Sequence, residues 1–453
     1  MKPGHAFVLG SGIAGLSLAE ILSRNGWRIT LLDNAHELGG DASRCTQNWF
    51  HTGWLYASLP SKAAMLGCSR ALRCFHGVYG SVVSPEVLNL ECGEQPVAYP
   101  ASERGWFSAE WVQYVYATAT ADLSWSQRLF WKTHLRAVAF RRLRALGYDA
   151  NVATTLEPRL MALLNYWEGS HVGHSRYQVV RSTDAQINTR RVLNTLLSLL
   201  GDEAHVVPSA QYSLTMASGR TAVRFDGETH IPDLVVMATG KSLAQQLFEL
   251  GSEKMASKFR SVCSPIVVLN RALDLPNFIR FTPNLPTTVN HIKYEIAGVG
   301  QRSTVGSYDY FPAGQAPDIS PFANRMCKRL NIPTSDVAKV YYGTKTEFTG
   351  SLKRRYNHAI GRVNENTYFA IPGKFSQFPL LAREFAEQLG LSVSIANLTR
   401  GTLRTEIAPT APEQAVSPVA PLVQPQVRYT APPRKPALVG DRPSCKSLPT
   451  RPR

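Results

Sequence analysis

The order of apolar and polar positions near the start of the chain predicts a compact strand–helix–strand unit. Residues 5–9 form a short apolar run, typical of a strand that is buried on both faces. Residues 13–25 then repeat apolar side chains at helical spacing, and Gly26 is suited to end that helix. Residues 28–33 are a second apolar run. This order predicts two parallel strands joined by a helical crossover.

Two more apolar runs further along the chain have the same character. Residues 234–238 are closed by Thr239-Gly240, and residues 367–371 are closed by Pro372-Gly373. A helix is expected to follow the second run, over residues 379–389. Short runs of this kind belong to parallel sheets that are covered on both faces, so we expect these strands to join the first two.

The turn between the first strand and the first helix carries a glycine pattern with a chemical meaning. It reads Gly10-Ser11-Gly12-Ile13-Ala14-Gly15, and Asp33 ends the next strand. In such a loop the first glycine permits a tight turn, the second lets a pyrophosphate approach the backbone, and the third lets helix and strand pack closely. The helix N-terminus attracts the phosphates, and Asp33 is placed to bind a ribose. The acidic side chain argues against NADP; the alternative is a glycine-rich turn without function.

These elements predict an α/β fold with a Rossmann-like nucleotide-binding domain built from discontinuous segments. The stretches between them mix helical patterns, such as residues 126–146, with β-rich ones, such as 264–269 and 339–342. They indicate an inserted α+β substrate domain. We assign residues 1–80, 180–245 and 355–400 to the nucleotide-binding domain, and residues 81–179 and 246–354 to the substrate or cap domain.

The end of the chain differs in composition from the rest. Residues 405–453 are rich in proline and in basic side chains and keep no apolar period. This composition predicts a disordered tail. Two interpretations of the tail stay open. It is a solvated extension without a partner, or it docks on an anionic surface or in an aromatic groove, and the sequence does not identify that partner.

Composition narrows the class of protein and its compartment. The chain is 44% hydrophobic and 18% charged, which is ordinary for a globular protein. No apolar run is long enough for a transmembrane segment. The seven cysteines form no CxxC pair and no metal-ligand spacing, so we expect no metal and a reducing, cytoplasmic location. The net charge of +16 favours acidic partners. No nucleic-acid-binding motif is present, however, so we do not expect the protein to bind nucleic acid.

Three features favour FAD over NAD as the cofactor. The glycine loop lies at the extreme N-terminus, and Glu37-Leu38-Gly39-Gly40 follows the second strand. The run ending in Ala238-Thr239-Gly240 is similar to a strand that passes close to FAD in flavoproteins. Only one glycine fingerprint occurs, so a separate NAD(P)H domain is not expected.

The residues after the second strand are similar to a known family. Ser43-Arg44-Cys45-Thr46 leads to His51-Thr52-Gly53-Trp54-Leu55-Tyr56, and Pro60-Ser61-Lys62-Ala63 follows. These segments resemble the D-amino-acid oxidase superfamily, including glycerol-3-phosphate and L-2-hydroxyglutarate dehydrogenases. Near the C-terminus, Gly373-Lys374-Phe375-Ser376 is similar to a turn that holds the flavin end of FAD there. The resemblance implies that Gly40, Ser43, Arg44, Thr46, Ala238, Thr239, Gly240, Gly373, Lys374, Phe375 and Ser376 bind FAD.

The resemblance also implies the candidate catalytic groups. A pKa near neutrality suits His51 to act as a base toward a substrate hydroxyl. Two other roles stay open: ordering the flavin pocket by hydrogen bonding, or bonding covalently to the flavin, as a similar histidine does in dimethylglycine and sarcosine dehydrogenases. Arg354 and Arg355, with Arg362, precede the last strand and are candidates to grip a substrate carboxylate; the alternative is a solvated surface.

The sequence thus predicts an FAD-dependent dehydrogenase or oxidase. It would oxidise a C–H bond next to a hydroxyl or amine of a small anionic substrate, such as a 2-hydroxy acid or an amino acid. Oxygen or a quinone would reoxidise the flavin. The competing hypotheses are a flavin-binding accessory protein of a biosynthetic assembly without turnover, and an NAD-binding regulatory protein.

Overall fold

The structure of the protein is a computed structural model. It describes residues 2–39, 42–59, 61–79, 106–107, 112–118, 123–148, 157–168, 177–201, 204–282, 288–296, 300–312, 319–349 and 357–393. The chain divides into two units, residues 1–405 and residues 406–453, and all the described residues belong to the first. The predicted tail lies outside the described residues, and so do Gly40, Arg354 and Arg355.

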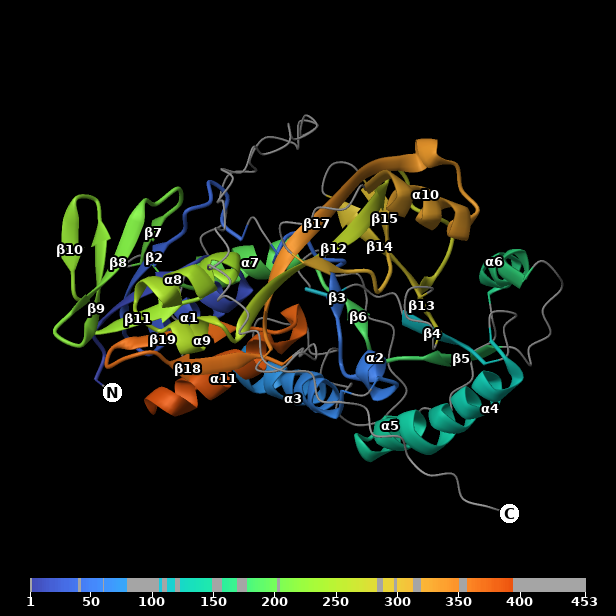
Figure 1. Ribbon diagram of the computed structural model, residues 1–453, viewed down its shortest axis with the longest axis horizontal. Coiled ribbons are helices and arrows are strands. Elements are labelled where there is room, and N and C mark those ends of the chain that lie inside the picture. Colours follow the sequence, from blue (N-terminus) through green and yellow to red (C-terminus); the bar gives the residue numbers. More distant parts are fainter. Residues whose placement is uncertain are drawn as a thin grey trace, which may run out of the picture. The chain divides into compact units, whose positions relative to one another are not determined.

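A six-stranded sheet forms the nucleotide-binding part of the fold (Figure 1). In spatial order its strands are β18 (Ala359–Arg362), β19 (Thr367–Ile371), β11 (Leu234–Met237), β1 (His5–Leu9), β2 (Arg28–Leu32) and β7 (His205–Val207). All are parallel except β18, which pairs antiparallel with β19. These strands come from three separate stretches of chain, as the apolar runs predict.

Both faces of this sheet are covered, which explains why β1 reads as an unbroken apolar run. Ala6 and Val8 face a layer of helices, whereas Phe7 and Leu9 point to the opposite face, because successive side chains of a strand alternate. The helical layer contains α1 (Ile13–Arg24), α3 (Lys62–Tyr79), α7 (Thr189–Ser198) and α11 (Phe378–Leu389). The other face packs against α8 (Leu243–Glu249), α9 (Glu253–Ala256) and the three-stranded sheet of β8 (Tyr212–Ala217), β9 (Arg220–Phe225) and β10 (Glu228–His230).

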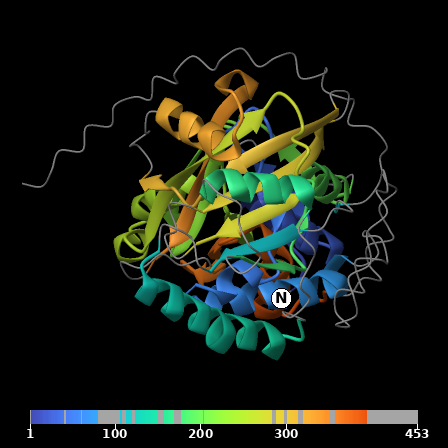
Figure 2. The same ribbon diagram turned by 90° about the vertical axis from the view of Figure 1, so that its right-hand side faces the viewer.

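An eight-stranded sheet forms the substrate domain (Figures 1 and 2). Its strands are β16 (Phe311–Pro312), β12 (Phe259–Leu269), β15 (Gly300–Gly306), β14 (Val289–Ile296), β13 (Asn277–Phe281), β4 (Val112–Ala117) and β5 (Tyr177–Arg181), with β17 (Val337–Phe348) paired to β12. Neighbours are antiparallel except β4 and β13, which are parallel and join two distant stretches of chain. A short pair of β3 (Trp49–Phe50) and β6 (Ala185–Gln186) stands apart from this sheet.

The remaining helices lie around the substrate domain. They are α2 (Trp54–Ala57), α4 (Trp125–His134), a π-helical stretch (Leu135–Phe140), α5 (Arg141–Ala145), α6 (Pro158–Glu168) and α10 (Ile319–Leu330). The long strands β12 and β17 connect the two sheets. Phe259, at the start of β12, packs on Phe369 of the parallel sheet, and Val267 near its other end belongs to the core of the substrate domain.

The predicted α/β fold class is confirmed: a parallel FAD-type sheet combines with a largely antiparallel second sheet. The predicted strands 5–9, 28–33, 234–238 and 367–371 all exist, with boundaries that differ by one residue at most. Among the described residues no helix is long and apolar enough to cross a membrane. The predicted domain boundaries stay a prediction.

Candidate active site

The glycine loop lies between the carboxyl end of β1 and the start of α1, tightly packed against its neighbours. Gly10 has a positive φ of 95°, and its N–H donates to the carbonyl of Leu32 at 2.8 Å. A Cβ on Gly15 would lie 1.7 Å from the carbonyl oxygen of Gly10, so only glycine fits there. The loop thus brings the first turn of α1 against the sheet, where its N–H groups have no intrahelical partners.

Asp33 fixes the shape of this loop. Its Oδ2 accepts hydrogen bonds from the N–H of Ser11 at 2.6 Å and from the Ser11 hydroxyl, and its Oδ1 accepts from the N–H of Ala35 at 2.8 Å. A carboxylate accepts about four hydrogen bonds, so the three made here leave capacity for one more. Asp33 also lines the pocket described below. Its role toward a ribose stays a prediction.

The segment 42–47 crosses the mouth of α1. The hydroxyl of Ser43 accepts a hydrogen bond from the N–H of Ile13 at 2.9 Å. Two glycines of the substrate sheet let the segment approach closely. A Cβ on Gly343 would lie 2.8 Å from Cβ and O of Cys45, and one on Gly306 would lie 2.3 Å from Nε2 of Gln47. Segment 42–47 is therefore held between α1 on one side and β15 and β17 on the other.

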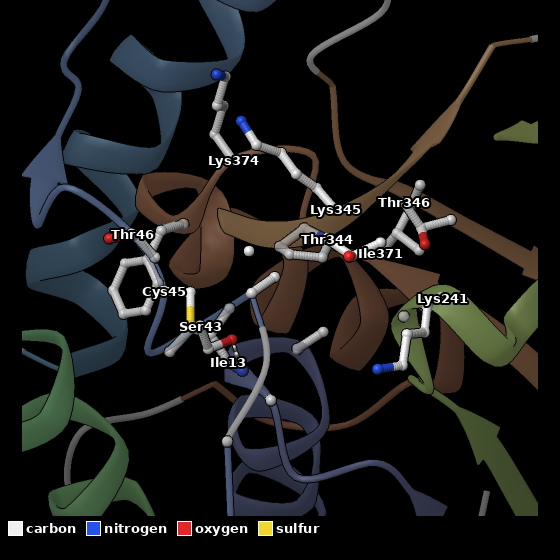
Figure 3. Close-up of a pocket in the computed structure, with 18 of the residues that line it drawn as sticks. Ile13, Ser43, Cys45, Thr46, Lys241, Thr344, Lys345, Thr346, Ile371 and Lys374 are labelled. Atoms are coloured by element: carbon white, nitrogen blue, oxygen red, sulfur yellow. Dashed lines mark hydrogen bonds between the residues drawn. The ribbon is translucent and has the colours of Figure 1, made fainter. Parts of the chain in front are cut away.

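A continuous pocket opens where these elements meet (Figure 3). It runs from Asp33 and Ala35, past the glycine loop, to His51 and the strands of the substrate domain. The predicted site residues that line it are Gly10, Gly12, Ile13, Ala14, Asp33, Ser43, Thr46, His51, Ala238, Thr239, Gly240, Gly373, Lys374 and Phe375. One pocket thus gathers candidates from three distant parts of the sequence.

Four other predicted residues do not line the pocket. Ser11 is bonded to Asp33, and Gly15 packs on Gly10. Arg44 forms an ion pair with Glu37, and Ser376 is buried at 1% exposure. Their positions suit them to support the loop rather than to contact a ligand. Arg362, considered with Arg354 and Arg355, bonds to the backbone carbonyls of Asn364 and Glu365.

His51 is buried at the inner end of the pocket and bonded to a carboxylate that the sequence did not single out. Its Nδ1 lies 3.0 Å from Oδ2 of Asp184. Asp184 is held in turn by Thr52, whose N–H and hydroxyl donate at 2.7 and 2.8 Å, and by the hydroxyl of Tyr114 at 2.6 Å. With Nδ1–H donated to Asp184, Nε2 of the neutral ring is the atom that can take a proton.

The electrostatics around His51 favour its neutral form. Burial lowers the pKa of His51 below its usual value; the hydrogen bond and charge of Asp184 oppose this, and the positive charges of Lys374 and Lys345 lower the pKa further. At neutral pH the ring is therefore a base rather than an acid. Asp184 fixes which nitrogen carries the proton.

Positive charge lines the same part of the pocket. Lys345 comes from β17, and Lys374 follows β19; Figure 3 shows both side chains extending to the same side of the pocket. The ammonium of Lys374 also lies 5.5 Å from the ring centre of Tyr56, a cation–π distance. The two lysines therefore bring positive charge to the same pocket as the buried His51.

The pocket residues fit a dinucleotide on structural grounds. Gly10 and Gly12, which carry no side chain, border the pocket beside the first turn of α1, and a helix N-terminus attracts negative phosphates. Comparison with protein families decides which dinucleotide. Residues 5–388 match the profile of the family described as DAO, FAD dependent oxidoreductase.

The chain belongs to this family of FAD-dependent oxidoreductases. The cofactor is therefore FAD, and the predictions of an FAD-dependent enzyme and of a D-amino-acid oxidase-type relative are confirmed at this level. Such an enzyme takes a small substrate and an electron acceptor. The hypothesis of an NAD-binding regulatory protein is excluded by the same finding.

Solved structures share the fold of this FAD-dependent oxidoreductase at low sequence identity. Glycine oxidase from Geobacillus kaustophilus has a TM-score of 0.60 at 12% identity, covering 86% of this chain and 95% of its own. L-alpha-glycerophosphate oxidase from Mycoplasma pneumoniae, solved with FAD bound, has a TM-score of 0.59 at 12% identity, covering 86% and 96%. These similarities establish the fold.

One curated protein shares a short, closely similar segment with this FAD-dependent oxidoreductase. The bifunctional tRNA 5-methylaminomethyl-2-thiouridine biosynthesis protein MnmC of Ralstonia nicotianae is 56% identical over 39 residues. The segment spans 9% of this chain and 6% of that protein. A match of this length does not transfer a substrate.

Asp184 and Lys345 are two residues at the candidate site that sequence reasoning missed. Asp184 follows a Ser-Thr pair in a stretch with no motif, and Lys345 lies in an alternating strand where a charged side chain is ordinary. No sequence signal separates either residue from its neighbours, because both reach His51 only through the folding of distant segments.

Proposed function

We propose that this enzyme oxidises a C–H bond next to a hydroxyl or amine of a small anionic substrate, such as a 2-hydroxy acid or an amino acid. His51 acts as the base, and Asp184 is its positioning residue. The observation that carries the proposal is the buried pair of His51 and Asp184, because His51 lines the same pocket as Lys345 and Lys374. FAD, when bound, accepts the hydride from the substrate carbon.

His51 handles the proton in this reaction. The substrate's O–H or N–H proton moves to Nε2 of His51, while the hydrogen of the neighbouring carbon leaves with its electron pair. Nε2 can accept because the Nδ1–H is donated to Asp184 at 3.0 Å. The imidazolium formed in this step is stabilised by the carboxylate of Asp184, which Thr52 and Tyr114 hold in place.

Lys345 and Lys374 are proposed to bind the anionic group of the substrate. Both line the pocket, and both act electrostatically on His51. A carboxylate between them would offset the positive charge that lowers the pKa of His51, so substrate binding would make the ring a stronger base. Arg354 and Arg355 remain candidates for the same role.

The cofactor would be held by the elements at the other end of the pocket. The first turn of α1 would receive the pyrophosphate, and Asp33 would use its remaining acceptor capacity on the ribose. Segment 42–47 and the turn Gly373–Phe375 would contact the flavin end. The glycines and amides there match the charge and shape of a dinucleotide.

An anaerobic substrate screen tests the proposal. Purified protein with bound FAD is mixed, without oxygen, with a panel of 2-hydroxy acids, amino acids, secondary amino acids and their uncharged amides, and the flavin absorbance is followed. We expect at least one carboxylate compound to bleach the flavin and its amide to act far more slowly. Failure of every compound, with FAD bound, would instead favour an accessory protein without turnover.

The other roles of His51 are tested with the same protein. If the yellow colour stays with the protein after acid precipitation, and is released in His51→Ala, then His51 is the covalent attachment site and not the base. Release of the colour from the unmodified protein is the expected outcome.

A further inference from the structure

The outer helix of the substrate domain, α4 with the π-helical stretch and α5, has one face firmly anchored. Trp131 packs on Phe281 with ring centres 5.6 Å apart, and Phe140 packs on Tyr116 at the same distance. Arg142 donates to the carbonyls of Ala57 and Leu59 at 3.2 Å each. This face belongs to a hydrophobic core, so the orientation of the helix on the molecule is fixed.

The opposite face of α4 exposes large apolar side chains to solvent. Trp125 is 76% exposed, Leu129 54% and Phe130 72%. Trp125 and Leu129 are one helical turn apart and share a face, and Phe130 is adjacent. Single exposed apolar residues need no explanation, but a tryptophan, a leucine and a phenylalanine exposed within six residues of one helix indicate a contact surface.

The same helix is uniformly basic. Residues 123–148 contain Arg128, Lys132, Arg136, Arg141, Arg142 and Arg144 and no aspartate or glutamate. Of these, Lys132, Arg136, Arg141 and Arg144 are exposed. In Figures 1 and 2 the helix lies along the outer side of the substrate domain, beneath α2 and β5 in Figure 1. An exposed apolar turn is thus continuous with a row of cations on a surface that faces outward.

We propose that this face, formed by α4, the π-helical stretch and α5, binds the surface of an anionic phospholipid bilayer. An aromatic and aliphatic edge bordered by lysine and arginine is the pattern of a helix that lies in a bilayer interface. The apolar side chains enter the boundary between headgroups and acyl chains, and the cations face the phosphates. A nucleic acid would satisfy the cations but would bury little of Leu129, and so fits the face less well.

Vesicle sedimentation with the full-length, FAD-loaded protein tests this proposal. The probes are vesicles of phosphatidylcholine alone and vesicles that also contain phosphatidylglycerol. We expect the protein to sediment with the anionic vesicles and to stay in solution with the neutral ones. Loss of either the apolar pair in Trp125→Gln/Phe130→Gln or the charge pair in Lys132→Gln/Arg136→Gln should weaken binding about tenfold or more.

Two control variants distinguish binding by this face from unspecific binding through exposed apolar or basic side chains elsewhere. Every variant keeps the basic tail, so binding through the tail alone would be the same in all of them. Phe248→Gln removes an apolar side chain that is 56% exposed on α8, and Lys254→Gln removes a lysine on α9. Both should bind vesicles as the unmodified protein does. All variants should keep their flavin absorbance and melting temperature, because the substituted side chains lie outside the core.

Three outcomes would overturn the proposal. Anionic vesicles fail to sediment the protein; the α4 variants bind as well as the unmodified chain; or the controls lose binding to the same degree. A parallel titration with polyuridylate addresses nucleic acid. If the unmodified protein binds polyuridylate but not vesicles, and the α4 variants lose that binding, the face is assigned to RNA instead.

Discussion

Asp184 holds His51 more firmly than an isolated carboxylate would, because its own position is fixed by other groups. Thr52 provides two hydrogen bonds and Tyr114 a third, and all of these groups are buried. A base that is already oriented loses little freedom in the reaction, which is how positioning contributes to rate. The ring should therefore depend on Asp184 for its orientation and for its proton affinity.

The pH dependence of kcat/KM should report this pair. Because the pKa of His51 is lowered by burial, the neutral base persists through neutral pH, and activity should fall only below the usual histidine value of about 6.5. Asp184→Asn removes the carboxylate whose charge and hydrogen bond raise the pKa of His51. The fall of kcat/KM on the acid side of the profile should therefore move to lower pH, and kcat at neutral pH should decrease. His51→Gln should remove the limb and lower kcat by about 10²–10⁴-fold.

The matched control for this experiment is Asp336→Asn, which alters a carboxylate paired with Arg271 on the far part of the substrate domain. It should leave both the rate and the profile unchanged. An Asp184→Asn variant with the profile of the unmodified enzyme would show that Asp184 has only a structural role.

At the scale of elements, β17 shapes through Gly343 the part of the pocket that we propose for FAD. Since a Cβ there would meet Cys45 and lie 3.2 Å from Cα of Ala42, Gly343→Ala should push segment 42–47 toward the mouth of α1. Overpacking of this kind costs about 1–3 kcal/mol. We expect the Kd for FAD, measured by fluorescence titration, to rise by roughly five- to a hundredfold.

Gly77→Ala is the control, because that glycine lies in α3 with open space around its Cβ position. It should leave FAD affinity unchanged and raise stability by about 1 kcal/mol through helix propensity. If Gly343→Ala binds FAD as tightly as the unmodified protein, then segment 42–47 moves aside without a loss of FAD affinity and does not form the FAD site.

The elements that the sequence predicted well are those with strong local patterns. β1, α1 and β2 were predicted because a buried strand, a helical period and a glycine loop follow one another within 30 residues or so of chain. β7, with three residues, and α3, with eighteen, were not predicted. β7 is too short to show a period, and the basic and small residues of α3 weaken its apolar stripe.

Local sequence patterns supplied candidate residues that are neighbours in the chain, but not candidates that only folding brings together. The glycine loop and His51 could be named because neighbouring residues define them. Asp184 reaches His51 only because β3 and β6 pair, placing Phe50 opposite Ala185. That pairing joins residues more than 130 positions apart, and two-residue strands leave no recognisable pattern.

For the whole molecule, the pocket ties the two sheets together, so FAD should stabilise both as one unit. At a hundredfold excess over Kd a ligand adds about 2.7 kcal/mol to folding stability. We expect FAD to raise the melting temperature of the apoprotein in a single transition. FMN, which lacks the adenosine half, should raise it much less, because it leaves the end near Asp33 and Ala35 empty.

A calorimetric scan of the apoprotein with each ligand makes this measurement. Equal shifts from FMN and FAD would contradict the proposed placement of the adenosine half. Two separate transitions in the presence of FAD would show that the cofactor does not couple the sheets.

The parallel pairing of β4 with β13 has a consequence for biosynthesis. Val112 pairs with Asn277, so the ribosome must complete most of the protein before β4 gains its partner strand. Until then one edge of the antiparallel β4–β5 pair, with Tyr114 and Tyr116 on β4, lacks its neighbouring strand. The nascent chain should therefore depend on chaperones during this interval, and slower translation just before β13 would lengthen its exposure to aggregation.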